Sequence, residues 1–245
     1  NPVIKQSVNT KMQMTQTYLS HVPCCTDVEF EIDPEFINVQ DWAKRNKMTL
    51  NLAKAKEIIF RRPSARRSLV LPPLLSLVER VRSTKLFGVF ITDTLKFNEH
   101  VNYVLKQSCQ RLYLLKLLRA QGLPLHQLHT VCVAMLISRI TYAICAWGGF
   151  CAAADVNRIN SFLKRLVKYG YMSTVVDFQF YLNQADMRLF KSITRSNVHC
   201  LQTLLPALKP TAGRELRKRN HMYILPAFRY ELFRKSFLLR CLYSS

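Results

Sequence analysis

Four carboxylates alternate with other residues in the stretch EFEIDPE: Glu29, Glu31, Asp33 and Glu35. In a β-strand they would share one face, and grouped carboxylates are ligands for divalent cations. Asp33 precedes Pro34, however, and this order is typical of a helix N-terminus. We therefore interpret Asp33 as a helix cap and the glutamates as solvated charges, and we expect no metal site here.

The eight cysteines contain no CxxC pair. Cys109 and Cys132 lie in apolar helical patterns, where a reduced thiol packs as a small hydrophobic group. A zinc site needs thiolates and imidazoles at short regular spacing, and His199 and Cys200 have no neighbours to complete one. We expect reduced thiols in an intracellular protein, without distinguishing nucleus from cytoplasm, and neither a bound metal nor a cofactor. The chain contains no GxSxG, HExxH or Walker loop that would indicate another enzyme class.

The charge of the chain is strongly asymmetric. The formal net charge is +21 over 245 residues, with 36 Lys and Arg against 15 Asp and Glu. Residues 1–60 hold seven basic and seven acidic side chains, so residues 61–245 carry the whole excess. Such a segment favours a polyanionic partner, and nucleic acid is the ordinary candidate. A basic surface without a partner is the alternative.

The elements that would position these charges are short strands followed by long helices. A helix is expected from about Pro34, and apolar runs predict strands at residues 48–52, 58–60, 85–91 and 95–97. The last two form a predicted hairpin joined by residues 92–94. Gly88 inside the first strand of that hairpin indicates a bulge or a close backbone approach.

Four helical blocks follow, beginning at Asn98, at Leu125, after a cap at Asp155, and within residues 176–205. Ile137, Ile140 and Ile144 share a face of the second block. They are expected to pack against two stripes, Val101/Val104/Leu105/Leu112 and Ile159/Phe162/Leu166. Residues 130–150 carry one charge, Arg139, which also permits a membrane span, but a central bundle helix is favoured because basic amphipathic helices flank it.

The tail interleaves cations with aromatic side chains, a pattern that can bind phosphates and stack on bases or can belong to a packed helix with a basic face. Both interpretations stay open. The residues concerned are Arg214, Arg217, Lys218, Arg219, Tyr223, Phe228, Arg229, Tyr230, Phe233, Arg234 and Lys235.

Five linked segments resemble, in order, the reverse transcriptases of non-LTR (LINE-type, jockey/CR1-like) retrotransposons. The likeness covers roughly residues 35–243. Its segments are DWAKRNKMTLNLAKAKEIIF, STKLFGVFITDTLKFNEHV, QRLYLLKLLRAQGL, SRITYAICAWGGF and YELFRKSFLLRCL. The resemblance implies an α+β, mostly α fold: a small palm-remnant sheet with a primer-grip-like hairpin, then a basic helical thumb bundle and a C-terminal extension.

The resemblance also implies roles for individual residues. Lys54 takes the place of a lysine that contacts the phosphates of the incoming nucleotide. The primer-grip-like hairpin comprises Lys85, Leu86, Phe87, Gly88 and Val89. The residues expected to contact the backbone of RNA or of an RNA–DNA template–primer are Lys106, Arg111, Lys116, Arg119, Arg158, Lys164, Arg165, Lys168, Arg217, Lys218 and Arg219.

Catalysis by this family uses aspartates that hold Mg²⁺. If the family's strand after its ADD turn aligns with TYLSHVP, Thr15 and Gln16 stand at the aspartate positions. We therefore expect a truncated or degenerate fragment of an RNA-directed DNA polymerase that binds nucleic acid but does not polymerise by itself. Its expected partners are the nucleic acid and the missing N-terminal palm and fingers or endonuclease portions of a parent polyprotein; no membrane partner is expected. The alternative is a host-retained, non-catalytic protein for nucleic-acid binding or complex assembly.

The expected organisation has four parts. Residues 1–30 form a poorly ordered remnant, and residues 31–97 the C-terminal part of a palm with its hairpin. Residues 98–172 form the helical thumb, and residues 173–245 a basic C-terminal extension.

Overall fold

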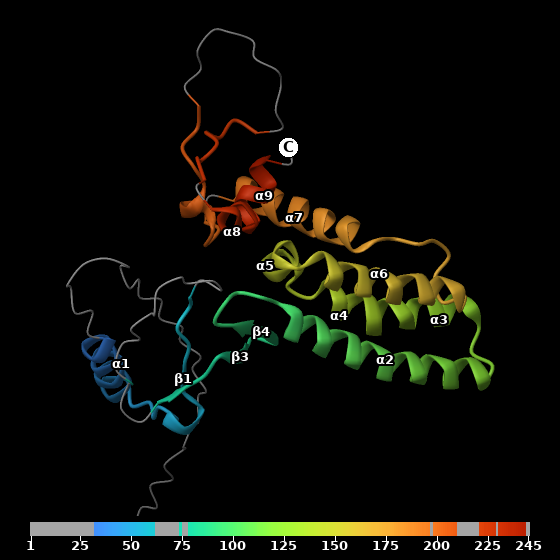
Figure 1. Ribbon diagram of the computed structural model, residues 1–245, viewed down its shortest axis with the longest axis horizontal. Coiled ribbons are helices and arrows are strands. Elements are labelled where there is room, and N and C mark those ends of the chain that lie inside the picture. The colour runs from blue at the N-terminus through green and yellow to red at the C-terminus, as the bar shows by residue number, and fades with distance from the viewer. Residues whose placement is uncertain are drawn as a thin grey trace, which may run out of the picture. The chain divides into compact units, whose positions relative to one another are not determined.

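The computed structural model describes residues 32–61, 74, 78–196, 198–209, 221–228 and 230–243. Within them the chain is mostly helical and has two sheets of two strands each, which confirms the expected α+β, mostly helical class (Figure 1). The chain divides into two compact units, Asn1–Thr84 and Lys85–Ser245. The boundaries expected after residues 30, 97 and 172 remain predictions.

The first unit contains the helix α1 (Ile32–Arg45) and a short 3-10 helix, η1 (Leu52–Lys54). The end of α1 is closed by Lys47, whose φ is +55°. The Met48 amide donates to the Ala43 carbonyl at 2.9 Å, and the Lys47 amide donates to the Lys44 carbonyl at 3.0 Å. These two bonds satisfy carbonyls that the helix end would otherwise leave unpaired.

Two predicted strands of the first unit are wrong. Residues 48–51 and 58–60 are irregular, and the sheet is formed instead by β1 (Lys56–Glu57) and β2 (Glu79–Arg80), which pair in parallel. Alternation of apolar residues needs a partner strand before it becomes a ladder, and none of the described residues provides one for residues 48–51. Ion pairs join the paired residues, Lys56 with Glu79 and Arg80 with Glu57.

The hairpin is present, but its turn differs from the prediction. The strands are β3 (Ser83–Leu86) and β4 (Val89–Thr92), so residues 95–97 are not a strand and residues 92–94 are not the turn. The turn is formed by Phe87 and Gly88, with φ of +46° and +86°. Positive φ at both central residues matches the right-handed twist of two-residue hairpins.

The second unit continues as a set of helices (Figure 1). Their bounds are α2 (Asn98–Ala120), α3 (Leu125–Cys132), the π-helix η2 (Val133–Ile137), α4 (Ser138–Thr141), α5 (Ile144–Trp147), η3 (Gly148–Phe150), α6 (Ala153–Lys168), α7 (Phe178–Arg195), η4 (Gln202–Leu204), α8 (Glu231–Arg234) and α9 (Phe237–Tyr243). Gly122 and Gly170 end α2 and α6 with φ of +86° and +74°, as expected for helix C-termini. The cap of α6 is Ala152 rather than Asp155, which lies in the first turn.

The second predicted helix is not continuous. A π-helical turn interrupts it at η2, and it breaks at Ala143, whose φ is +50°. The break turns the Tyr142 carbonyl away from a helical partner, and the Trp147 indole donates to it at 2.9 Å. Periodicity alone contains no signal for such a break, because the apolar residues continue on both sides.

The core of the second unit is the one predicted from helical spacing. Ile137, Ile140 and Ile144 are buried, and they belong to one cluster with the two predicted stripes. The stripe members are Val101, Val104, Leu105 and Leu112 on α2, and Ile159, Phe162 and Leu166 on α6. Burying a large aliphatic or aromatic side chain contributes about 1.5–3 kcal/mol, so this cluster is the main source of stability for the unit.

In the described part of the chain, one stretch, Leu125–Phe150, is long and apolar enough to cross a membrane. Buried core helices have the same length and apolarity. Leu128, Leu136, Ile140 and Trp147 of this stretch are fully buried in the unit, which favours the core interpretation.

Candidate nucleic-acid interface

Polar side chains from α2 and α6 line an open groove of about 640 Å³. On each helix they recur every three or four residues, so they lie on one side of it. The groove is lined by Asn102, Leu105, Lys106 and Cys109 of α2 and by Asn157, Arg158, Ser161 and Arg165 of α6. We call it the basic groove. It brings together three residues that the sequence predicted for nucleic-acid binding, Lys106, Arg158 and Arg165.

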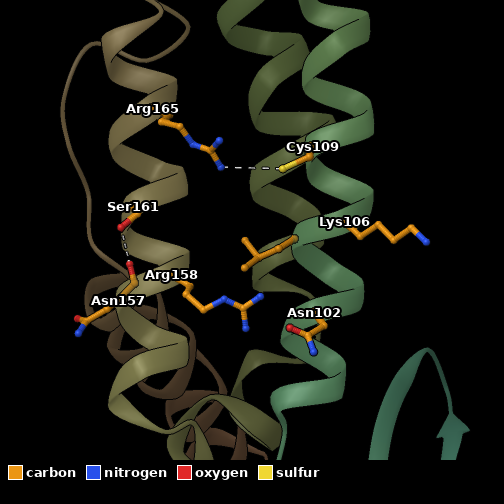
Figure 2. A pocket seen from close by; sticks show the side chains of 8 residues that line it. Asn102, Lys106, Cys109, Asn157, Arg158, Ser161 and Arg165 are labelled. Atoms are coloured by element: carbon orange, nitrogen blue, oxygen red, sulfur yellow. Dashed lines mark hydrogen bonds between the residues drawn. The ribbon is translucent and has the colours of Figure 1, made fainter.

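The two arginines reach from α6 toward α2, whereas Lys106 extends away from α6 (Figure 2). Arg158 is partly neutralised, because its guanidinium is 3.1 Å from the Asp155 carboxylate. Arg165 contacts the Cys109 thiol at 3.9 Å and lies 5.4 Å from the centre of the Phe162 ring. Among the described residues, neither Arg165 nor Lys106 has a carboxylate within ion-pair distance. The groove therefore carries positive charge that the described residues leave uncompensated.

Cations and tyrosines gather where α2 and α6 end. The Arg119 guanidinium donates to the Tyr169 carbonyl at 2.7 Å and lies 6.0 Å from the centre of the Tyr171 ring. The Lys116 ammonium lies 5.1 Å from the centre of the Tyr169 ring. These contacts fasten the α6 terminus to α2 and hold both cations in place at the surface.

The other predicted helical residues are distributed differently. Arg111 is half-buried, and its guanidinium donates to the Met135 carbonyl of η2 at 3.1 Å. It therefore satisfies a carbonyl in the π-helical turn. Lys164 and Lys168 are exposed on α6 but do not line the groove.

The hairpin residues predicted as a primer grip pack against α2 and the break after α4. The Lys85 ammonium donates to the Tyr103 hydroxyl at 3.0 Å and lies 4.2 Å from the centre of its ring. This hydrogen bond lowers the pKa of Tyr103. Val89 is buried, Leu86 half-buried and Phe87 exposed. The tip is thus the accessible part of the hairpin.

Gly88 is needed where it stands. A Cβ at this position would lie 3.3 Å from Cε1 of Tyr142, and its φ of +86° is one that other residues rarely adopt. Gly88 lies in the turn and not, as the sequence predicted, inside a strand.

His100 lies beneath the hairpin and is 2% exposed. Burial, reinforced by the Lys85 charge, lowers its pKa to about 4. The Phe90 amide approaches its Nδ1 at 3.4 Å, and its ring meets Trp147 edge-on with centroids 4.8 Å apart. The Nε2 atom has no hydrogen-bond partner among the described residues. His100 is therefore a neutral core residue near neutral pH.

The remaining predicted site residues belong to the first unit or lie outside the described residues. Lys54 is exposed in η1 of the first unit. Thr15, Gln16, Arg217, Lys218 and Arg219 lie outside the described residues.

Sequence reasoning missed a buried ion pair between Arg240 and Asp186. The guanidinium donates to both carboxylate oxygens at 3.0 Å, and it also donates to the Cys145 carbonyl at 2.9 Å. A Cβ at Gly149 would lie 2.0 Å from the Arg240 guanidinium, so this glycine leaves the space that the arginine fills. An arginine inside the apolar run FLLRCL was the available signal.

Four buried or half-buried thiols of the second unit are poor nucleophiles at neutral pH. Burial raises the pKa of Cys132 to about 11 and the pKa values of Cys145, Cys151 and Cys241 to about 12. Over the described ranges, no three His, Cys, Asp or Glu side chains come together in a way that could hold a metal ion.

No family model, curated protein or solved structure matches the chain.

Proposed function

We propose that the helical unit binds nucleic acid through its phosphate backbone, with the basic groove as the contact surface. The observation that carries the proposal is Arg165, which reaches from α6 toward α2 and has no carboxylate partner among the described residues. Lys106 of α2, which extends away from α6, is a second cation without such a partner in those residues. A phosphate supplies the missing negative charge, and a guanidinium can donate two hydrogen bonds to it.

The distribution of charge supports the same partner. Residues 61–245 contain the entire excess of +21, and release of condensed counterions makes such a surface bind polyanions strongly at low salt. Backbone contacts carry no base sequence, so we propose binding with little sequence preference.

We further propose that the chain is the C-terminal part of a non-LTR reverse transcriptase. In this assignment α2 to α6 form the thumb and β3–β4 form the primer grip, and together they hold a template–primer. The five ordered sequence segments support this assignment. The Phe87–Gly88 turn, with its exposed tip, is compatible with close approach to a strand. We propose no polymerase activity, because Thr15 and Gln16 cannot hold Mg²⁺ as aspartates do.

The test removes the two uncompensated charges of the groove. The double variant Lys106→Gln/Arg165→Gln should bind a fluorescent RNA–DNA hybrid at least about tenfold more weakly at 0.1 M salt, because two phosphate contacts are lost. The matched control, Lys44→Gln/Arg45→Gln, removes two exposed charges from α1 and should change the affinity far less. An equal loss of affinity in both variants would mean that binding depends only on the net charge of the chain and not on the groove.

Primer extension tests the polymerase part separately. The chain, incubated with a primed poly(rA) template, deoxythymidine triphosphate and Mg²⁺ or Mn²⁺, should extend nothing. Template-dependent extension above a blank would contradict the assignment of Thr15 and Gln16.

A further inference from the structure

The C-terminal half of α7 carries a second basic surface that is separate from the groove. Arg188, Lys191, Ser192, Arg195 and Ser196 line an open hollow of about 390 Å³. The three cations are spaced by three and four residues and therefore lie on one side of the helix. All three are exposed.

These cations lack partners within the described part of the chain. None of them forms an ion pair there, and the carboxylate of Asp186 on the same helix is taken by Arg240. Favourable interaction with the helix dipole accounts for a cation in the last turn. It accounts for Arg195 but not for Arg188, which lies about two turns earlier.

The two serines add hydrogen-bond donors to the hollow. The Ser196 hydroxyl oxygen accepts from the Val198 amide at 3.4 Å, and a hydroxyl that accepts one hydrogen bond can still donate its own proton. From Arg188 to Arg195 the helix rises roughly 10 Å. A row of cations and hydroxyls of that length suits successive phosphates better than one isolated anion.

We infer that this face of α7 is a second contact for the phosphodiester backbone of the same nucleic acid, and this inference rests on the function proposed for the basic groove. A single extended polyanion can neutralise the positive charge of both surfaces, whereas a compact anion can neutralise that of only one. Occupation of both makes binding to a long strand stronger than binding by the groove alone.

The experiment measures how the affinity for a 40-nucleotide oligo(dT) depends on salt, using the full chain. The triple variant Arg188→Gln/Lys191→Gln/Arg195→Gln should reduce the magnitude of the slope of log K against log salt by about 2, since each lost single-strand contact removes roughly 0.7. The control Lys44→Gln/Arg45→Gln/Lys47→Gln removes the same formal charge from the end of α1 and the turn after it. Its slope should stay within error of the parent.

Two further arms separate the possible failures. Adding Lys106→Gln/Arg165→Gln to the triple variant should reduce the magnitude of the slope further, because the groove and the face of α7 contact different phosphates. An unchanged slope in the triple variant, with a clear loss in the groove variant, overturns the α7 site and leaves the groove standing. An unchanged slope in both variants overturns both proposals. If the triple variant loses binding to polyglutamate but retains oligo(dT) binding, the surface recognises an acidic protein and the inference is wrong.

Discussion

The Tyr142 hydroxyl donates a hydrogen bond to the Phe87 carbonyl at 3.0 Å, which joins the tip of the hairpin to the break that follows α4. The Tyr142 carbonyl accepts from the Trp147 indole at 2.9 Å. One residue therefore ties an exposed turn to a fully buried tryptophan. The shape of the tip depends on a residue more than 50 positions away in sequence.

Replacing Gly88 with alanine should destabilise the unit through two separate effects. A positive φ costs an L-residue about 1–2 kcal/mol, and the new Cβ meets Tyr142 at 3.3 Å. Gly122→Ala is the matched control, because its φ is also +86° but nothing lies within 4 Å of its Cβ. In urea unfolding, Gly88→Ala should cost more than Gly122→Ala. Equal costs would show that Tyr142 does not confine the turn.

The buried ion pair between Arg240 and Asp186 should contribute far more to the free energy of unfolding than an exposed ion pair does. Arg240→Met leaves the Asp186 carboxylate and the Cys145 carbonyl without their donor, and the expected loss is about 3–5 kcal/mol. Arg234 pairs with Glu231 at 3.0 Å, but both side chains are more than half exposed. Arg234→Met should therefore cost under about 1 kcal/mol. Similar denaturation midpoints for the two variants would contradict the buried geometry.

His100 should make stability depend on pH. Its pKa is about 4 in the folded protein and about 6.5 when unfolded, so below pH 6.5 the unfolded chain binds a proton that the folded chain excludes. Its contribution to the free energy of unfolding should fall between pH 6.5 and pH 4, by up to about 3 kcal/mol, and change no further below pH 4. His100→Gln should abolish this part of the pH dependence. A parent and variant with parallel stability profiles would show that His100 is solvated.

Two single variants should distinguish a residue that stabilises the core from a residue at the surface. Ile140 is fully buried, so Ile140→Ala should lower the free energy of unfolding by about 2–5 kcal/mol. Lys164 is exposed on α6 outside the groove, so Lys164→Ala should leave stability nearly unchanged and weaken nucleic-acid binding less than Arg165→Gln does. Retention of the protein in membranes after carbonate extraction would contradict the core interpretation of residues 125–150.

The long helices of the second unit could be predicted because their apolar residues recur at helical spacing and pack on one another. The strand predicted at residues 48–52 does not form. Alternating apolar and polar residues form a strand only where a partner strand completes the hydrogen-bond ladder, and the local sequence does not reveal whether one is present. The break at Ala143 likewise gives no local signal. It is stabilised by the contacts of Tyr142 and Trp147, which are set by tertiary packing.

The candidate site, too, could be predicted from the sequence only in part. The resemblance, together with the basic faces of the helices, selected Lys106, Arg158 and Arg165, which line the groove. The same criteria also selected Arg111, whose guanidinium instead binds a backbone carbonyl of η2. They passed over the row on α7, because the apolar residues between its cations resemble those of any amphipathic helix.

The most direct test of the account is the salt dependence of binding to an RNA–DNA hybrid, compared between the parent chain and Lys106→Gln/Arg165→Gln. The parent should show a steep negative slope of log K against log salt, and the variant a slope smaller in magnitude by about 1.4–1.8, since each of the two neutralised phosphates contributes roughly 0.7–0.9. A parent isotherm that stays the same between low and physiological salt, or a variant slope equal to that of the parent, would contradict backbone binding in the basic groove.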